Sequence, residues 1–302
     1  SAFEFKVLAD PCAVMHWVPI IDQPAIAIVP GPPRHWKAVV STLRRPEEPF
    51  QLGVKVEDDW GNPSDQVRTT LRLEPSLPVC GLPNTLEFVA GNKAVQIENL
   101  RVTEEGELTI KIVEDATGKL LCEAGPLIVQ NGAYGGYWGD LHGQSGESIG
   151  ITNAREYFDF ARNIAFLDVI SHQANDFQVN NAFWAHLNEL TAQHNQDGRL
   201  VALPGYEWSG NTSVGGDRNV YFREEGRQIR RSSHALLPDQ SDIHTDANDA
   251  RELFATLKDE DCCIYAHVGG RFADLNFAHD PKLETAMEVH SAWGTFEWLL
   301  TD

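Results

Sequence analysis

Apolar and polar residues alternate with a period of two along several short stretches in the first half of the chain. In residues 50–56, for example, Phe50, Leu52, Val54 and Val56 would share one face of a strand. Similar stretches follow at residues 70–73, 86–89, 94–97, 108–113 and 126–129, each bounded by glycine, asparagine or proline. Strands this short, with no helical stretch between them, predict an all-β sandwich.

The stretches on either side of these strands are rich in proline or glycine instead of alternating apolar and polar residues. Residues 1–30 are rich in proline, which favours edge strands and connections over helices. Residues 130–136 contain three glycines and an asparagine and are typical of a linker. The pattern therefore predicts a sandwich domain with its linker at residues 1–136 and a second domain at residues 137–302. Through the stretch VKVEDDWGNP at 54–63 and the strand at 106–113, the first domain resembles immunoglobulin-like or fibronectin-like modules of bacterial proteins.

From residue 153 onward the period changes to that of amphipathic helices. Helices are expected from Asn153, over residues 181–194 and from Asp249, because apolar residues there recur at helical spacing behind capping residues. Buried strands are expected between them, at residues 165–170, 200–203, 220–222, 262–266 and 286–289. Alternating strands and helices predict a parallel sheet.

Residues that can bind metals stand at the ends of these apolar runs. His142, His172, Glu207, Asp217 and His267 each lie at or just after one of them. A single histidine at a strand end is more often a structural residue, but five such positions point to one mouth of a parallel barrel.

The charge of the chain narrows the choice of partners. The formal net charge is −20, of which −6 lies in residues 1–136 and −14 in residues 137–302. Such a field repels nucleic acids and anionic membranes, so neither is expected as a partner. No apolar run is long enough to cross a bilayer and no signal peptide opens the chain, which favours the cytoplasm, although a removed leader stays possible because the chain begins at Ser1.

The second half resembles the PHP superfamily, named for polymerase and histidinol phosphatase domains, and in particular a bacterial branch of unknown function with a preceding sandwich. The resemblance is carried by four motifs: YWGDLH at 137–142, GYEWS at 205–209, RNVYFR at 218–223 and EVHSAWGTFEW at 288–298. It implies a distorted (β/α)7 barrel that holds divalent metal ions (manganese, zinc or iron) and hydrolyses phosphate esters.

The chain departs from the family pattern at several positions. His142-Gly143-Gln144 replaces His-x-His, Ser171-His172-Gln173 replaces Ser/Thr-Asp-His, and Asp217 replaces a histidine. With these departures, the resemblance implies that one or two ions are bound. The expected ligands are His142, Gln144, His172, Glu207, Asp217 and His267. The family closes its site with an Asp-x-His motif near the last strand, and this chain reaches residue 302 without such a motif after its last predicted strand. We therefore expect either that the chain is a fragment of a longer protein or that its barrel is shortened and open.

The expected function is a metal-dependent phosphoesterase acting on a small anionic substrate. Glu207 would bridge the metals, and Arg218 would stabilise the substrate's charge. A polar insertion after residue 223 is either a solvated loop or a substrate-binding loop carrying Arg227, Arg230, Arg231 and His234, and His290 is a further candidate for substrate binding. The alternative is a degenerate barrel that has lost catalysis and serves as a binding or structural module. The sequence indicates neither the substrate nor the oligomeric state.

Overall fold

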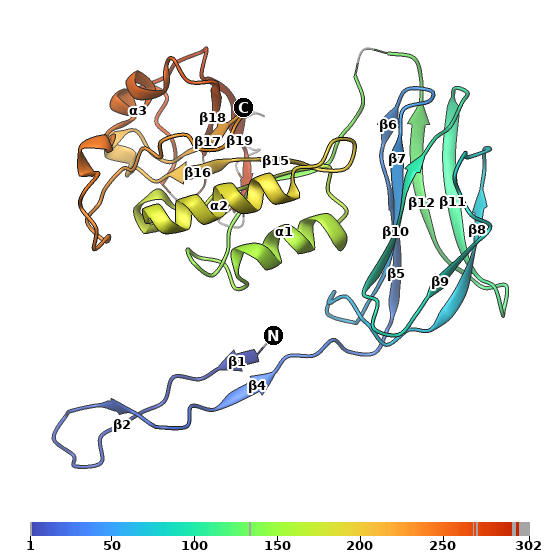
Figure 1. The fold of residues 1–302 in the computed structure, drawn as a ribbon, viewed down its shortest axis with the longest axis horizontal. Coiled ribbons are helices and arrows are strands. Elements are labelled where there is room, and N and C mark those ends of the chain that lie inside the picture. The colour runs from blue at the N-terminus through green and yellow to red at the C-terminus, as the bar shows by residue number, and fades with distance from the viewer. Residues whose placement is uncertain (1, 133, 268, 270, 292–293, 296–302) are drawn as a thin grey trace.

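A computed structural model describes residues 2–132, 134–267, 269, 271–291 and 294–295. Figure 1 shows two compact parts and a protruding arm. The first part is all β and the second mixes strands with helices. Within the fourth motif of the family resemblance, residues 292–293 and 296–298 lie outside the described residues.

The first part consists of two sheets that face each other. A three-stranded antiparallel sheet has the order β10-β7-β5, and a five-stranded sheet has the order β6-β12-β11-β8-β9, with only β6 and β12 parallel. The strands are β5 (His35–Val40), β6 (Leu43–Arg44), β7 (Phe50–Glu57), β8 (Thr69–Pro75), β9 (Thr85–Phe88), β10 (Ala94–Leu100), β11 (Gly106–Glu114) and β12 (Leu120–Val129).

The alternating residues of both sheets form one hydrophobic core. Leu52, Val54 and Val56 of β7 are fully buried, and they share this core with Leu108 and Ile110 of β11. Because side chains alternate across a strand, the same period that predicts these strands also directs their apolar residues between the two sheets.

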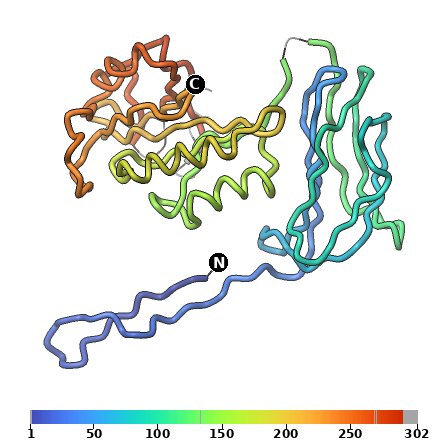
Figure 2. The backbone as a smooth tube through the Cα atoms, viewed as in Figure 1, coloured from blue at the N-terminus to red at the C-terminus, as the bar shows by residue number. Residues whose placement is uncertain are grey.

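The arm is formed by residues before β5. Strand β1 (Ala2–Glu4) pairs with β4 (Ala25–Ala27), and β2 (Leu8–Ala9) pairs with β3 (Val18–Pro19), so that an open hairpin extends away from both compact parts (Figure 2). Many of its large apolar side chains are exposed, including Met15, Trp17 and Ile21.

The second part contains two larger sheets and three α-helices in its described residues. One sheet has the order β13-β14-β15 and the other β16-β17-β18-β19. The strands are β13 (Gly139–Gly143), β14 (Val169–His172), β15 (Val201–Leu203), β16 (Gly205–Trp208), β17 (Arg218–Phe222), β18 (Cys262–His267) and β19 (Glu284–Glu288), with a small pair β20 (His290–Ser291) and β21 (Gly294–Thr295). The helices are α1 (Ala154–Asn163), α2 (Asn181–His194) and α3 (Ala250–Leu257).

The prediction of a (β/α)7 barrel is wrong, because the described strands form separate sheets and no closed barrel. The first sheet is parallel as expected, but β17 runs antiparallel to both β16 and β18. The sequence pattern gave no sign of β16 as a separate strand. Only residues 209–217 join β16 to β17, and a parallel pair needs a crossover of about a dozen residues or more, so this short loop reverses the chain.

The helices begin where their capping residues predict. Asn153 and Glu156 form a reciprocal capping box at the start of α1, and Asp249 accepts hydrogen bonds from the first backbone N–H groups of α3. The predicted helix over residues 181–194 is confirmed as α2, which begins after Asn180. No helix in the described part of the chain is long and apolar enough to cross a membrane.

The two parts contact each other through buried side chains. Arg199 donates hydrogen bonds to Glu98 and Gln96 of β10, at 3.1 Å each, and to carbonyl oxygens of Leu167 and Arg162 in the second part. Gly53 of β7 lies directly against the ring of Phe166, where a Cβ atom would overlap the ring. These contacts fix the sandwich against the side of the second part that carries α1.

Candidate metal centre

Acidic and histidine side chains from several strands of the second part converge in one place. His142 comes from β13, Glu207 from β16, His267 from the end of β18 and Glu288 from the end of β19. Asp217 immediately precedes β17. Their ligand atoms fall into two groups that share His267, and within each group the atoms lie within 4.8 Å of one another. We refer to these five residues as the metal centre.

The first group contains His142, His267 and Glu288. His142 Nδ1 lies 2.8 Å from Glu288 Oε2, and the rings of His142 and His267 meet edge to face with centroids 4.8 Å apart. Asn219 of β17 donates from Nδ2 to the same Glu288 oxygen at 2.7 Å. Glu288 therefore connects the last large strand to β13, although the two strands are in different sheets.

The second group contains Glu207, Asp217 and His267, all buried. His267 Nδ1 lies 3.5 Å from Glu207 Oε1 and 3.8 Å from Asp217 Oδ2. Glu207 Oε2 also lies 3.6 Å from His142 Nε2. Glu207 thus faces both histidines and stands between the two groups.

The pKa shifts in this centre reflect its crowded negative charge. Burial disfavours the charged form of His142, but the bonds to Glu207 and Glu288 outweigh it and raise the pKa of the imidazole to about 10. Burial raises the pKa of the Asp217 carboxyl, and the nearby charge of Glu207 acts in the same direction, while the His267 imidazole 3.8 Å away acts against it. A bound divalent cation would compensate this charge.

The donor set fits a divalent metal ion. Both ring nitrogens of His267 are buried, and neither has a hydrogen-bond partner among the described residues; the same holds for Oδ1 of Asn219. Buried polar atoms are rarely left without a partner, so these atoms indicate a missing ligand. Imidazole nitrogens combined with carboxylate oxygens suit manganese, iron or zinc.

Neutral and acidic side chains surround Glu207. Gln144 donates from Nε2 to Glu207 Oε2 at 3.2 Å, and its Oε1 accepts a hydrogen bond from Ser148 at 2.8 Å. Asn175 donates to the same Glu207 oxygen. Asp176, the next residue after Asn175 in the chain, is fully buried, and burial raises the pKa of its carboxyl to about 6. Gln144 therefore lies at the centre, but its amide nitrogen, not its carbonyl oxygen, faces the carboxylate.

His172, another predicted ligand, lies apart from both groups. Its Nε2 is 2.8 Å from Ser145 Oγ, and the rings of Tyr157, Phe158 and Phe183 surround it. Burial lowers the pKa of His172 to about 4. This apolar setting favours a neutral structural histidine.

Arg218 is placed differently from the substrate-stabilising role predicted for it. Its side chain is 0% exposed, and its Nε forms an ion pair with the buried Glu284 at 3.0 Å. The other guanidinium nitrogens donate to carbonyl oxygens of Gly215, Gly216 and Ala278. Arg218 therefore holds the loops around β17 together and presents no free nitrogen to a substrate.

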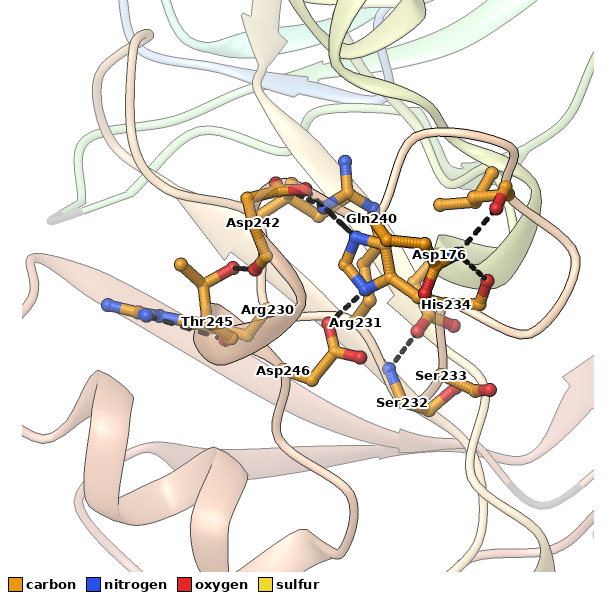
Figure 3. A network of polar contacts seen from close by, with 12 residues as sticks. Asp176, Arg230, Arg231, Ser232, Ser233, His234, Gln240, Asp242, Thr245 and Asp246 are labelled. Carbon is orange, nitrogen blue, oxygen red and sulfur yellow. Dashed lines mark hydrogen bonds and ion pairs between the residues drawn. The ribbon is translucent and has the colours of Figure 1, made fainter.

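The insertion residues Arg230, Arg231 and His234 belong to a network outside the metal centre (Figure 3). Arg231 is fully buried and donates to Val179, Asn181 and Asp242. His234 lies between Asp242 Oδ1 at 2.9 Å and Asp246 Oδ1 at 2.6 Å.

The other predicted substrate-binding residues are likewise not grouped with the metal centre. Arg227 pairs with Glu224 at 3.1 Å and Glu260 at 3.3 Å. The Arg230 guanidinium donates to the carbonyl oxygen of Thr245 at 3.5 Å. His290 lies in β20, two residues beyond Glu288, and is exposed.

Two residues at the centre carried no predicted role. Glu288 is the third residue of the predicted strand 286–289, and its place near the end of that strand was the available signal. Arg271 follows β18 in an irregular loop and contacts Asp217. No pattern marks Arg271, because it lies outside the periodic segments.

The fold and the centre define a two-part protein in which a β-sandwich precedes an α/β region with a candidate metal site. Residues 141–269 match the model of a family described as "Protein of unknown function (DUF3604)". The matched segment includes His142, Glu207, Asp217 and His267, and it ends before Glu288.

Two relatives come from chlamydiae. An uncharacterized protein of Chlamydia pneumoniae is 23% identical over 255 residues, which cover 82% of this chain and 39% of the relative. An uncharacterized protein of Chlamydia trachomatis serovar D is 22% identical over 256 residues, with the same two shares. The chain thus spans about two fifths of the length of these relatives.

Proposed function

We propose that this protein is a metal-dependent hydrolase that acts on a phosphate ester or a related anionic substrate. The observation that carries the proposal is the convergence of two histidines and three carboxylates, with neither nitrogen of the buried His267 hydrogen-bonded to a described residue. The resemblance of the motifs around His142, Glu207 and Asn219 to the PHP superfamily is a second support, and it supplies the reaction class.

His142, Glu207, Asp217, His267 and Glu288 would hold one or two ions. A bound divalent ion would lower the pKa of a water molecule and offset charge on phosphoryl oxygens. Asn219 orients Glu288, while Asn175 and Gln144 orient Glu207 through the hydrogen bonds that they donate to it. The burial of the centre limits the access of bulk water and so strengthens its electrostatic interactions.

The first test measures bound manganese in Glu207→Gln and Glu288→Gln, each against the wild type. Each substitution replaces a charged oxygen by a neutral amide of the same shape, so we expect the Mn²⁺ affinity to fall by about tenfold or more. Glu189→Gln is the matched control, because Glu189 is exposed on α2 and should leave the affinity unchanged.

The same pair of variants reports the number of ions. If two ions bind, electron paramagnetic resonance titration should show that Glu288→Gln loses about one equivalent, because Glu288 belongs to one group only. Glu207→Gln should weaken the binding of both ions, because Glu207 faces both histidines and stands between the groups. If one ion binds, each variant should lose it entirely. A wild type that binds no Mn²⁺, Zn²⁺ or Fe²⁺ would reject the hydrolase proposal and favour the non-catalytic binding module.

Activity completes the test. Metal-loaded wild type should hydrolyse at least one member of a panel of phosphate monoesters and diesters, and Glu207→Gln should lose that activity. Hydrolysis that persists at the same rate after chelation and removal of metal would contradict the metal-dependent mechanism.

A further inference from the structure

Arg271 lies beside the metal centre and contacts it through its Nε atom. Arg271 Nε lies 3.1 Å from Asp217 Oδ1 and 3.2 Å from Oδ2. Its two terminal guanidinium nitrogens form no hydrogen bond or ion pair with any residue that the structure describes, and the side chain is 37% exposed. One edge of the guanidinium is therefore fixed at the centre, while the other is open.

The surroundings of Arg271 hold it in this position. The backbone N–H of Asp217 donates to the carbonyl oxygen of Arg271 at 2.8 Å, and the guanidinium carbon lies 5.5 Å from the centroid of the Phe177 ring. Gly216 has φ +78° and lies so close to the next residues of the loop that a Cβ atom there would overlap the carbonyl oxygen of Phe272. The loop that carries Arg271 is thus packed directly against the segment that carries Asp217.

An arginine in this setting suits an oxyanion. A guanidinium presents paired N–H donors in a fixed plane, which match two oxygens of a phosphate or carboxylate. The four arginines for which a substrate contact was predicted are engaged elsewhere. Arg218 and Arg231 are fully buried in internal bonds, Arg227 pairs with two glutamates, and Arg230 donates to the carbonyl oxygen of Thr245.

We infer that Arg271 binds the anionic group of the substrate with its open guanidinium edge while Asp217 holds its Nε. This inference rests on the proposed function, because without a cation the three carboxylates of the centre would repel an anion. Arg271 is then a residue that determines specificity for a phosphoryl group.

The test uses inorganic phosphate as the probe and ³¹P relaxation by protein-bound Mn²⁺ as the readout. In metal-loaded wild type we expect saturable relaxation of phosphate. Arg271→Gln should weaken phosphate binding by about tenfold or more, because a charge-assisted hydrogen-bonding pair is lost. Arg271→Lys keeps the positive charge but lacks the planar pair of N–H donors, so its phosphate affinity should lie between those of the wild type and Arg271→Gln.

The matched control is Arg223→Gln. Arg223 follows the far end of β17, is largely exposed and pairs with Asp261 at 3.5 Å, so its loss changes the net charge equally without touching the centre. Phosphate affinity should be unchanged in this variant.

Two failures can be told apart. A wild type that binds no Mn²⁺ rejects the proposed function and this inference with it. A wild type that binds Mn²⁺ but shows equal phosphate affinity in Arg271→Gln overturns only the inference. If Arg271→Gln lowers Mn²⁺ affinity and leaves phosphate affinity of the loaded protein unchanged, Arg271 merely positions Asp217. Acetate, titrated in the same way, shows whether the open edge prefers phosphate to a carboxylate.

Discussion

Two buried histidines in the second part show that surroundings, more than residue type, decide what a side chain can do. His267 lies among carboxylates, 3.5 Å from Glu207 and 3.8 Å from Asp217, and neither ring nitrogen has a hydrogen-bond partner among the described residues. His172 is equally buried, but aromatic rings surround it and one of its nitrogens is bonded to Ser145. The surroundings of His267 suit a metal ligand, and those of His172 suit a neutral imidazole in a hydrophobic core.

A stability prediction follows for His172. Burial lowers the pKa of His172 to about 4, below the value near 6.5 of an unfolded chain, so the unfolded state takes up the proton first as pH falls. The contribution of neutral His172 to the free energy of unfolding is fully present above pH 6.5 and is lost as the pH falls toward 4. We expect the free energy of unfolding to decrease by about 2 kcal/mol between pH 7 and pH 5 through this residue.

The variant His172→Phe provides the comparison, measured by urea unfolding at several pH values. It removes the titrating group and keeps an aromatic ring among Tyr157, Phe158 and Phe183, so the stability should depend less on pH in this range. Parallel pH profiles of wild type and variant would show that His172 does not titrate as described. Mn²⁺ binding should be retained in the variant, because His172 lies outside both ligand groups.

Among the elements, the turn before β17 connects packing with the metal centre. Gly216 adopts φ +78°, and Gly226 in the insertion adopts φ +79°, but only Gly216 has neighbours within contact distance. The two glycines therefore form a matched pair, in which backbone conformation is the same and crowding differs.

We expect Gly216→Ala to destabilise the protein by about 1–3 kcal/mol more than Gly226→Ala. Both variants carry the cost of a left-handed backbone, roughly 1–2 kcal/mol, and only Gly216→Ala adds the clash with Phe272. Gly216→Ala should also weaken Mn²⁺ and phosphate binding, because the loop with Arg271 must move away from Asp217. Calorimetry and the manganese titration check both effects, and equal stability of the two variants would contradict this account.

For the whole molecule, Arg199 is a buried polar connection between the sandwich and the second part, beside the ion pair of Arg44 with Asp168 at 3.6 Å. Its side chain is buried and bonds Glu98 and Gln96 on one side, and Leu167 and Arg162 on the other. These hydrogen bonds join the two parts through one buried side chain.

Arg199→Ala should loosen this connection. We expect a loss of about 1–3 kcal/mol and a calorimetric transition that splits or broadens, because the two parts then unfold more independently. Arg72→Ala is the control: Arg72 pairs with Glu74 and Asp115 on the sandwich surface, and exposed pairs of this kind contribute about 1 kcal/mol or less. A single, unchanged transition in Arg199→Ala would show that the Arg199 bonds do not couple the two parts.

The sequence by itself determined the local structure of much of the chain. Alternating residues predicted the strands that became β7 to β12, and the caps at Asn153 and Asp249 predicted where α1 and α3 begin. These features depend on neighbours a few residues away, which periodicity and capping record directly. For the same reason His142, Glu207, Asp217 and His267 could be singled out, since each stands at the end of an apolar run.

The tertiary structure alone decided how these pieces meet. It set β17 antiparallel to β16 and β18, buried Arg218 against Glu284, and placed Glu288 beside His142, 146 residues away in the chain. Such contacts depend on the direction of each strand and on where loops return, and a local pattern carries neither. Alternation shows which residues of a strand share a face, whereas only the packed chain shows what that face meets, so the barrel was predicted wrongly and the role of Arg271 was not foreseen.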